Sequence, residues 1–86
     1  MNEEGFTICD KKGKLSRGPV RNGNSNSVRF PVSCPNGGKP RALYHTHPSG
    51  DLRPSNADIE SSRKFNLPVC IGLPNGKKVK CYPPEK

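Results

Sequence analysis

The chain has no tryptophan, few aromatic residues of any kind and only two histidines. None of its apolar runs approaches the roughly 20 residues of a transmembrane helix, so we expect no membrane span. With five aromatic side chains in all, no stretch alternates them with basic residues in the manner of a nucleic-acid groove. Because histidine is so scarce, a cluster that uses both copies is informative.

Residues that build a hydrophobic core are also few. Leu, Ile, Val and Phe make up less than one fifth of the 86 residues, beside 9 glycines, 10 prolines and a formal net charge of +8. This composition borders on that of disordered chains. The apolar residues are nevertheless grouped into short runs between turn residues. We therefore expect one loop-rich globular domain over residues 1–86, with a metal contributing to its stability.

The four cysteines are widely spaced. The nearest two, Cys70 and Cys81, are eleven positions apart, so there is no C-x-x-C pair for a structural zinc. Four cysteines allow two disulfides in three pairings. However, the N-terminal residues carry no apolar signal region, and Cys9, Cys70 and Cys81 lie inside apolar runs. We therefore expect a cytoplasmic protein with reduced, buried thiols.

The order of apolar and turn-forming residues predicts an α+β domain, a small mixed β-sheet with one main helix. Strands are expected at 6–9, 14–20, 41–47, 67–73 and 77–82, with hairpin turns at 10–13 and 75–76. Residues 28–32 alternate apolar side chains with Arg29 and Pro31, which predicts a half-buried edge strand. A helix is expected from Asn56 to about Asn66, with Ser55 as its N-cap and Asp58 completing a capping box.

The expected strand at 41–47 carries both histidines. Because side chains alternate along a strand, Leu43, His45 and His47 project from the same face. Two neighbouring imidazoles are what two ligands of one metal require, and Asp58 at the start of the following helix can supply a third. Three protein ligands and a water are the usual set around catalytic zinc, which lowers the pKa of that water to about 7.

Hydrolysis needs two further groups. Glu3 or Glu4 would act as the general base, and the hydroxyl of Ser55 would donate to a developing oxyanion. Each feature has a simpler interpretation, as a plain helix cap, as surface histidines or as a solvated acidic terminus. Their coincidence in one short chain favours a metal site.

The run His45-Thr46-His47-Pro48, followed by Ser55 and Asp58, resembles the JAMM (MPN+) zinc metalloproteases. It matches every fixed position of their signature, H-[ST]-H-P-x-x-x-x-x-x-S-x-x-D. The resemblance implies a minimal prokaryotic or archaeal type of JAMM domain, with a cytidine-deaminase-like sheet and one zinc. His45, His47 and Asp58 would be its ligands together with a water, an N-terminal glutamate its acid/base, and Ser55 the oxyanion stabiliser. Members of the family cleave peptide or isopeptide bonds at the C-terminus of ubiquitin-like or sulfur-carrier proteins, so such a protein is the expected partner.

The resemblance also bears on the choice of glutamate. Family members carry apolar residues two and four positions after theirs, and Phe6 and Ile8 fit that spacing from Glu4. Glu4 is therefore the expected acid/base and Glu3 the alternative. The family's glutamate usually follows a helix and another strand, so a minimal or trimmed version of the domain is expected here.

Lysine-rich clusters at 11–17 and 77–80 flank the two expected hairpin turns. They are either an ordinary solvated basic surface, which is slightly favoured, or a surface that attracts an acidic partner, a ubiquitin-like protein or nucleic acid. An extended substrate could add to the expected edge strand at 28–32. Two other functions stay open. One is a non-catalytic MPN-like or nucleic-acid-binding module. The other is an iron enzyme, because two histidines and one carboxylate also describe the facial triad of non-haem Fe(II) oxygenases.

Overall fold

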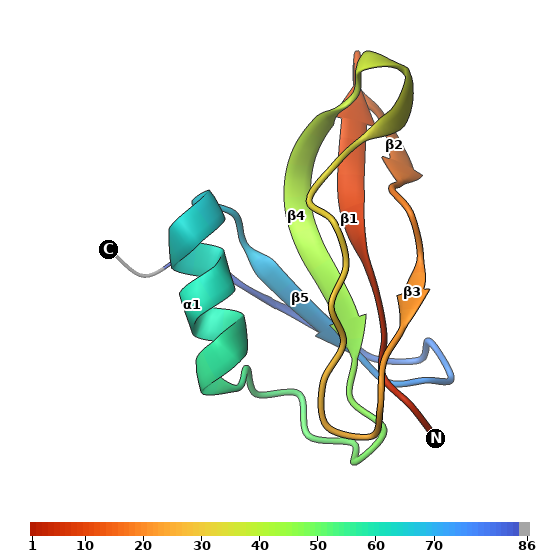
Figure 1. Ribbon diagram of the computed structural model, residues 1–86, viewed down its shortest axis with the longest axis vertical. Coiled ribbons are helices and arrows are strands. Elements are labelled where there is room, and N and C mark those ends of the chain that lie inside the picture. Colours follow the sequence, from red (N-terminus) through yellow and green to blue (C-terminus); the bar gives the residue numbers. More distant parts are fainter. Residues whose placement is uncertain (85–86) are drawn as a thin grey trace.

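The computed structural model describes residues 1–84. Its elements are strands β1 (Glu4–Lys11), β2 (Lys14–Arg17), β3 (Arg21–Asn22), β4 (Lys39–Thr46), β5 (Val69–Gly72) and β6 (Val79–Tyr82), the helix α1 (Asn56–Phe65) and a short 3-10 turn η1 (Pro35–Gly37). The strands form one six-stranded sheet of order β2-β1-β4-β5-β6, with β3 also paired to β1. β4 and β5 run parallel and the other described pairs antiparallel. The sheet is therefore mixed, and the predicted α+β fold is confirmed (Figure 1).

Two hairpins form where the turn residues predict them. Between β1 and β2, the amide of Gly13 donates to Asp10 Oδ1 at 2.9 Å. Gly13 has a φ of 85°, which glycine adopts at no steric cost. Between β5 and β6, the amide of Lys77 donates to Asn75 Oδ1 at 2.9 Å. The returning strands are shorter than predicted, since β2 ends at Arg17 and β6 begins at Val79.

Helix α1 connects the two parallel strands. A parallel pair cannot be joined by a tight turn, so the chain must leave the sheet after β4 and cross over before β5. The helix begins after the N-cap Ser55 and ends at Phe65, and its C-cap Asn66 takes the left-handed conformation with φ 53°. Both ends agree with the prediction. The loop and helix therefore bring the first turn of α1 back towards the carboxyl end of β4 (Figure 1).

The segment from residue 23 to residue 34 does not form the predicted edge strand. None of its residues is in a strand, and the segment instead crosses the face of β1 and β4 as extended chain (Figure 1). The alternation is still present, because Val28, Phe30 and Val32 are half-buried and the residues between them exposed. Phe30 packs over Gly5, where a Cβ atom would come within 2.6 Å of its ring. The prediction was wrong because a segment packed on a face shows the same alternation as a strand at an edge.

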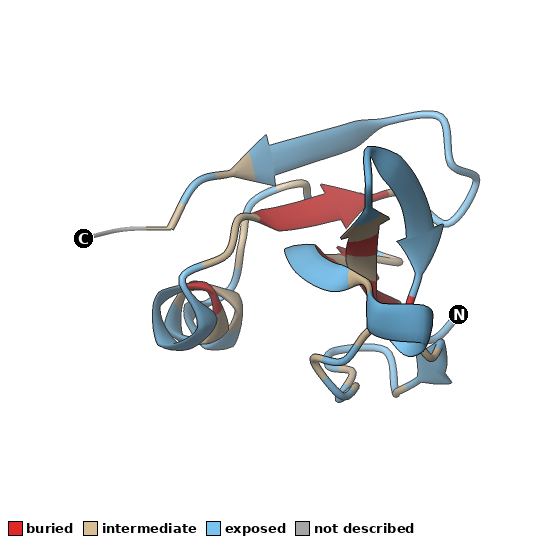
Figure 2. Cartoon of the chain, turned by 90° about the horizontal axis from the view of Figure 1, so that it is seen from above, coloured by how far each residue is buried: buried red, intermediate tan, exposed pale blue. Residues whose placement is uncertain are grey.

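The hydrophobic core lies on the face of the sheet that this segment covers. Leu43, Val69 and Ile71 are almost inaccessible. Half-buried apolar side chains pack against them, namely Phe30, Val32, Leu52, Leu67 and Tyr82. Leu43 is in register with Val69, and His45 with Ile71, so the core and the histidines share one face of the sheet. Figure 2 shows the buried residues gathered in the middle strands, while β6 is mostly exposed.

All four cysteines are paired, which corrects the expectation of reduced thiols. Cys9 bonds to Cys34, and Cys70 bonds to Cys81. The first pair ties the covering segment to β1, and the second joins β5 to β6. Spacing alone could not identify these partners, because the register of β5 with β6 brings Cys70 to Cys81 and the path of the covering segment brings Cys34 to Cys9. Disulfides are typical of oxidising compartments, so the expected cytoplasmic location stays a prediction with this observation against it.

No helix within residues 1–84 has the length and apolar character needed to cross a membrane.

Candidate metal centre

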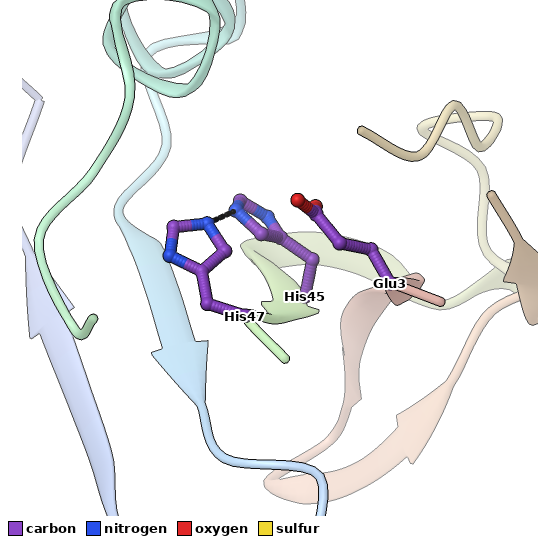
Figure 3. Close-up of side chains that lie close together, drawn as sticks. All are labelled: Glu3, His45 and His47. Atoms are coloured by element: carbon purple, nitrogen blue, oxygen red, sulfur yellow. Dashed lines mark hydrogen bonds between the residues drawn. The ribbon is translucent and has the colours of Figure 1, made fainter. Parts of the chain in front are cut away.

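His45 and His47 lie at the carboxyl end of β4, which is flanked by β1 and β5. His47 follows the last residue of the strand, and its amide still donates to the carbonyl oxygen of Gly72 at 3.0 Å. His45 is 4% exposed, and the side chain of His47 is 12% exposed. The two Nε2 atoms are 3.1 Å apart (Figure 3). The prediction that both imidazoles project from one face is confirmed.

Asp58 reaches the histidines from the first turn of α1. Its Oδ1 lies 3.0 Å from His45 Nε2, and its Oδ2 lies 3.5 Å from His47 Nε2. The capping box holds this carboxylate in place. The amide of Ser55 donates to Asp58 Oδ2 at 2.7 Å, and the amide of Asp58 donates to Ser55 Oγ at 3.2 Å. The same contacts that begin the helix therefore aim its carboxylate at the imidazoles.

The spacing of these three groups suits a single metal ion. With zinc-to-ligand bonds of 2.0–2.1 Å, two ligand atoms of a tetrahedral site are about 3.3 Å apart. The three separations among His45, His47 and Asp58 are 3.0, 3.1 and 3.5 Å. The separations are thus close to those between ligands of one ion, although the two histidines contact different oxygens of the Asp58 carboxylate.

A backbone contact determines the tautomer of a neutral His47 ring. Its Nδ1 lies 2.7 Å from the carbonyl oxygen of Asp51. A carbonyl only accepts, so Nδ1 carries the proton, and a neutral His47 presents the lone pair of Nε2 to the centre. Such a partner on the second nitrogen is usual for metal-binding histidines. The side chain of Asp51 is held by Arg53, whose Nε lies 3.2 Å from Asp51 Oδ1.

Glu3 completes the cluster from the start of the chain. Its ligand atom and those of His45 and His47 lie within 4.8 Å of one another, so the three residues can hold a metal ion. Figure 3 shows its carboxylate beside the ring of His45. Two backbone hydrogen bonds anchor the residue: its amide donates to Asn24 at 2.7 Å, and its carbonyl accepts from Gly23 at 2.8 Å. Glu3 is 5% exposed.

Two opposite pKa shifts mark the acids of the centre. Burial raises the pKa of Glu3 above its ordinary value, more than the attraction of His45 and His47 lowers it. Burial also acts to raise the pKa of Asp58. There, the hydrogen bond and charge of His45, with the hydrogen bonds from Ser55, prevail and lower it. Asp58 is therefore favoured as the anionic ligand, while Glu3 more readily keeps or accepts a proton.

Glu4, the glutamate favoured from sequence, points to the opposite face of the sheet. Gly5 is in register with His45, so Glu3, two residues before Gly5, shares the histidine face and Glu4 does not. The amide of Glu4 donates to Thr46 Oγ1 at 2.9 Å, and its side chain lies in a hollow with Phe6 and Tyr44. The structure therefore places Glu3, the alternative, beside the histidines in place of Glu4, because the spacing to Phe6 and Ile8 does not reveal which residues near the start of β1 face the histidines of β4.

Ser55 lies at the edge of a polar cleft of about 390 Å³ that also includes Glu3 and His47. Its Oγ accepts the hydrogen bond from Asp58, which leaves its own O–H available to donate. Ser55 therefore has the proximity and the free donor that the predicted role demands. Asp51, whose carbonyl orients His47, was not identified from sequence, since a backbone contact leaves no signal in residue type.

Comparison of the chain with protein-family models, with curated proteins and with solved structures finds no match in any of the three. The site is therefore defined by its own geometry, as a candidate metal centre at the carboxyl end of the central strand of a small α+β domain.

Proposed function

We infer that this chain is a zinc-dependent hydrolase of peptide or isopeptide bonds, a minimal domain of the JAMM (MPN+) type with a cytidine-deaminase-like core. The observation that carries the inference is the close approach of His45, His47 and Asp58, whose side chains contact one another pairwise at 3.0–3.5 Å. A buried glutamate of raised pKa stands beside it. Side chains suited to the roles of ligands and of acid/base thus come together from three separate parts of the chain.

His45, His47 and Asp58 would hold the ion, leaving one position open for a water. Zinc bound there would supply a water whose pKa falls to about 7. Nitrogen and oxygen donors also suit iron. Zinc is proposed because the ligand spacing suits a tetrahedral site and the surrounding motif resembles the JAMM signature.

Glu3 would carry the proton. Its carboxylate takes a proton from the attacking water and delivers it to the leaving amine, which is general base and then general acid catalysis. A carboxyl works best in this role when its pKa approaches the working pH, and burial moves the pKa of Glu3 in that direction. Ser55 would donate its free O–H to the oxyanion that forms on the substrate carbonyl.

The proposed substrate is the C-terminal region of a ubiquitin-like or sulfur-carrier protein, of acidic character. The net charge of +8 favours encounter with an acidic partner. This assignment rests on the motif resemblance and on charge.

The test combines metal analysis with a cleavage assay. The protein purified without added metal should contain close to one zinc per chain and little iron. It should cleave a ubiquitin-like conjugate, lose that activity with 1,10-phenanthroline and regain it when zinc is restored. Full cleavage by metal-free protein would contradict the proposal, and iron as the bound metal would favour the oxygenase alternative.

A further inference from the structure

A second cleft, which shares no lining residue with the polar one, also borders the metal centre. It has a volume of about 280 Å³ and lies between the extended segment 28–32 and helix α1. Val28 and Phe30 line one wall, Phe65 lines the other, and Leu43 and Val69 of the core lie at its base. His45 and Asp58 also line this cleft. An occupant of the apolar cleft would therefore touch two of the three proposed metal ligands.

The walls of the cleft leave apolar surface uncovered. Phe65 is the last residue of α1 and remains 42% exposed, and Val28 and Phe30 are only half-buried. The volume is close to the lower end of the range for small-molecule pockets, about 300 Å³. That is room for one large side chain and its flanking backbone.

The backbone along one wall is also unpaired. Within residues 1–84, Val28, Arg29 and Phe30 make no backbone hydrogen bond, although their chain is extended. Extended backbone with free N–H and C=O groups can pair with a second extended chain, and its alternating side chains then select alternate residues of that chain. The exposed Arg29 lines the cleft, and no ion pair of Arg29 occurs in the described part of the chain. It therefore favours an acidic residue beside the one that enters.

We propose that this cleft is the specificity pocket of the enzyme. It receives a large apolar side chain, of the size of leucine or phenylalanine, from an extended acidic peptide whose backbone pairs along residues 28–30. This side chain would lie next to the bond that is cleaved, because His45 and Asp58 line the pocket that holds it. The proposal rests on the proposed function for the reaction but not for the binding.

Binding of uncleaved peptides tests the pocket directly. Acetylated peptides Gly-Gly-X-Asp-Gly, with X as Leu, Phe, Ala or Asp, would be titrated into the full chain with and without zinc, followed by calorimetry and NMR. The Leu and Phe peptides should bind at least about 10-fold more tightly than the Ala peptide, since each methylene in an apolar pocket is worth about 10-fold or more. They should also shift the signals of Val28, Val69 and Phe65. Exchange of the peptide Asp for Lys should weaken binding, and Arg29→Glu should reverse that preference.

A variant whose new side chain fills the cleft can be compared with one that carries the same side chain outside it. Ser61 lines it from α1, so Ser61→Phe should abolish the preference for Leu over Ala. Glu60→Phe adds the same ring at the adjacent exposed position and should leave the preference for Leu over Ala unchanged. Phe65→Ala removes one wall and should reduce the preference. Equal zinc affinity and equal far-UV circular dichroism across the variants would show that each is folded.

The outcomes separate this proposal from the proposed function. Equal affinity for all four peptides, or a preference that Ser61→Phe leaves intact, would overturn the pocket whatever the activity. Selective binding without any cleavage by the zinc-loaded protein would support the pocket and count against the hydrolase.

Discussion

Asp58 contacts His45 with one carboxylate oxygen and caps its own helix with the other. Oδ1 lies 3.0 Å from His45 Nε2, while Oδ2 accepts the amide of Ser55 at 2.7 Å. A residue that begins the helix is thus also a candidate ligand. Helix initiation and the proposed metal binding use the same side chain, and substitutions can separate the two roles.

Asp58→Asn should weaken zinc binding far more than it weakens the fold. The amide still offers an oxygen to the Ser55 N–H, so the free energy of unfolding should change by no more than about 1 kcal/mol, as for other caps. Zinc affinity should fall by more than about 100-fold, because loss of an orienting partner alone costs 10–100-fold. Competition with a fluorescent chelator measures the affinity. Asp10→Asn removes a carboxylate distant from the centre, paired with Arg41, and should leave zinc affinity unchanged.

Glu3→Gln should abolish hydrolysis while zinc stays bound, because the amide cannot accept the proton of the water. We expect kcat to fall by about 10²–10⁴, the usual contribution of a positioned acid/base. Glu4→Gln is the matched control, since it removes the same charge one residue away on the opposite face. Similar loss of activity in both variants would argue against a catalytic role specific to Glu3.

The metal-free protein should also become more stable in Glu3→Gln. Because the pKa of Glu3 is raised in the folded state, the stability gained by protonating it is present below the ordinary value of 4.5 and lost as pH rises through the raised pKa. At neutral pH the native glutamate therefore opposes folding, and at pH 4 the advantage of the variant should shrink. Urea unfolding in EDTA at the two pH values measures this difference.

The contribution of Asp58 to stability should show the opposite dependence on pH. Its pKa is lowered in the folded state, so its contribution to stability is present above the ordinary value of 3.8 and is lost as pH falls through the lowered pKa. Acid unfolding of the metal-free wild type should therefore lose a component that Asp58→Asn lacks. Parallel acid unfolding curves for the two proteins would contradict this assignment.

Loss of the Cys9–Cys34 disulfide should destabilise the fold and loosen the cover over the metal face. Its two cysteines are 25 residues apart, for which chain entropy gives about 3.5 kcal/mol, against about 2.8 kcal/mol for the 11-residue separation of Cys70 and Cys81. C9A/C34A should also weaken binding in the apolar cleft, because the segment that lines it is no longer tied down. C70A/C81A is the comparison, and calorimetry measures both effects.

The parts of the site that the sequence predicts are those set by local geometry. Alternation along a strand placed His45 and His47 on one face, and the capping box placed Ser55 and Asp58 across one helical turn. The parts it misses depend on pairing between distant segments. The register of β1 against β4 decides between Glu3 and Glu4, and sheet assembly decides which cysteines meet. Residues 28–32 show what periodicity cannot predict. Alternation indicates that one side of a segment is buried, but it does not identify the surface against which that side packs.

The groups of the candidate metal centre stand at positions 3, 45, 47 and 58, before the first strand, at the carboxyl end of the central strand and on the helix. An ion held by His45, His47 and Asp58 would fasten the end of β4 to the first turn of α1, in a domain with few large core residues. Its binding energy would then add to the free energy of unfolding, by about 4.1 kcal/mol when free zinc is 1,000 times its dissociation constant. For such a chain, the supply of zinc would govern how long the molecule survives as well as how fast it works.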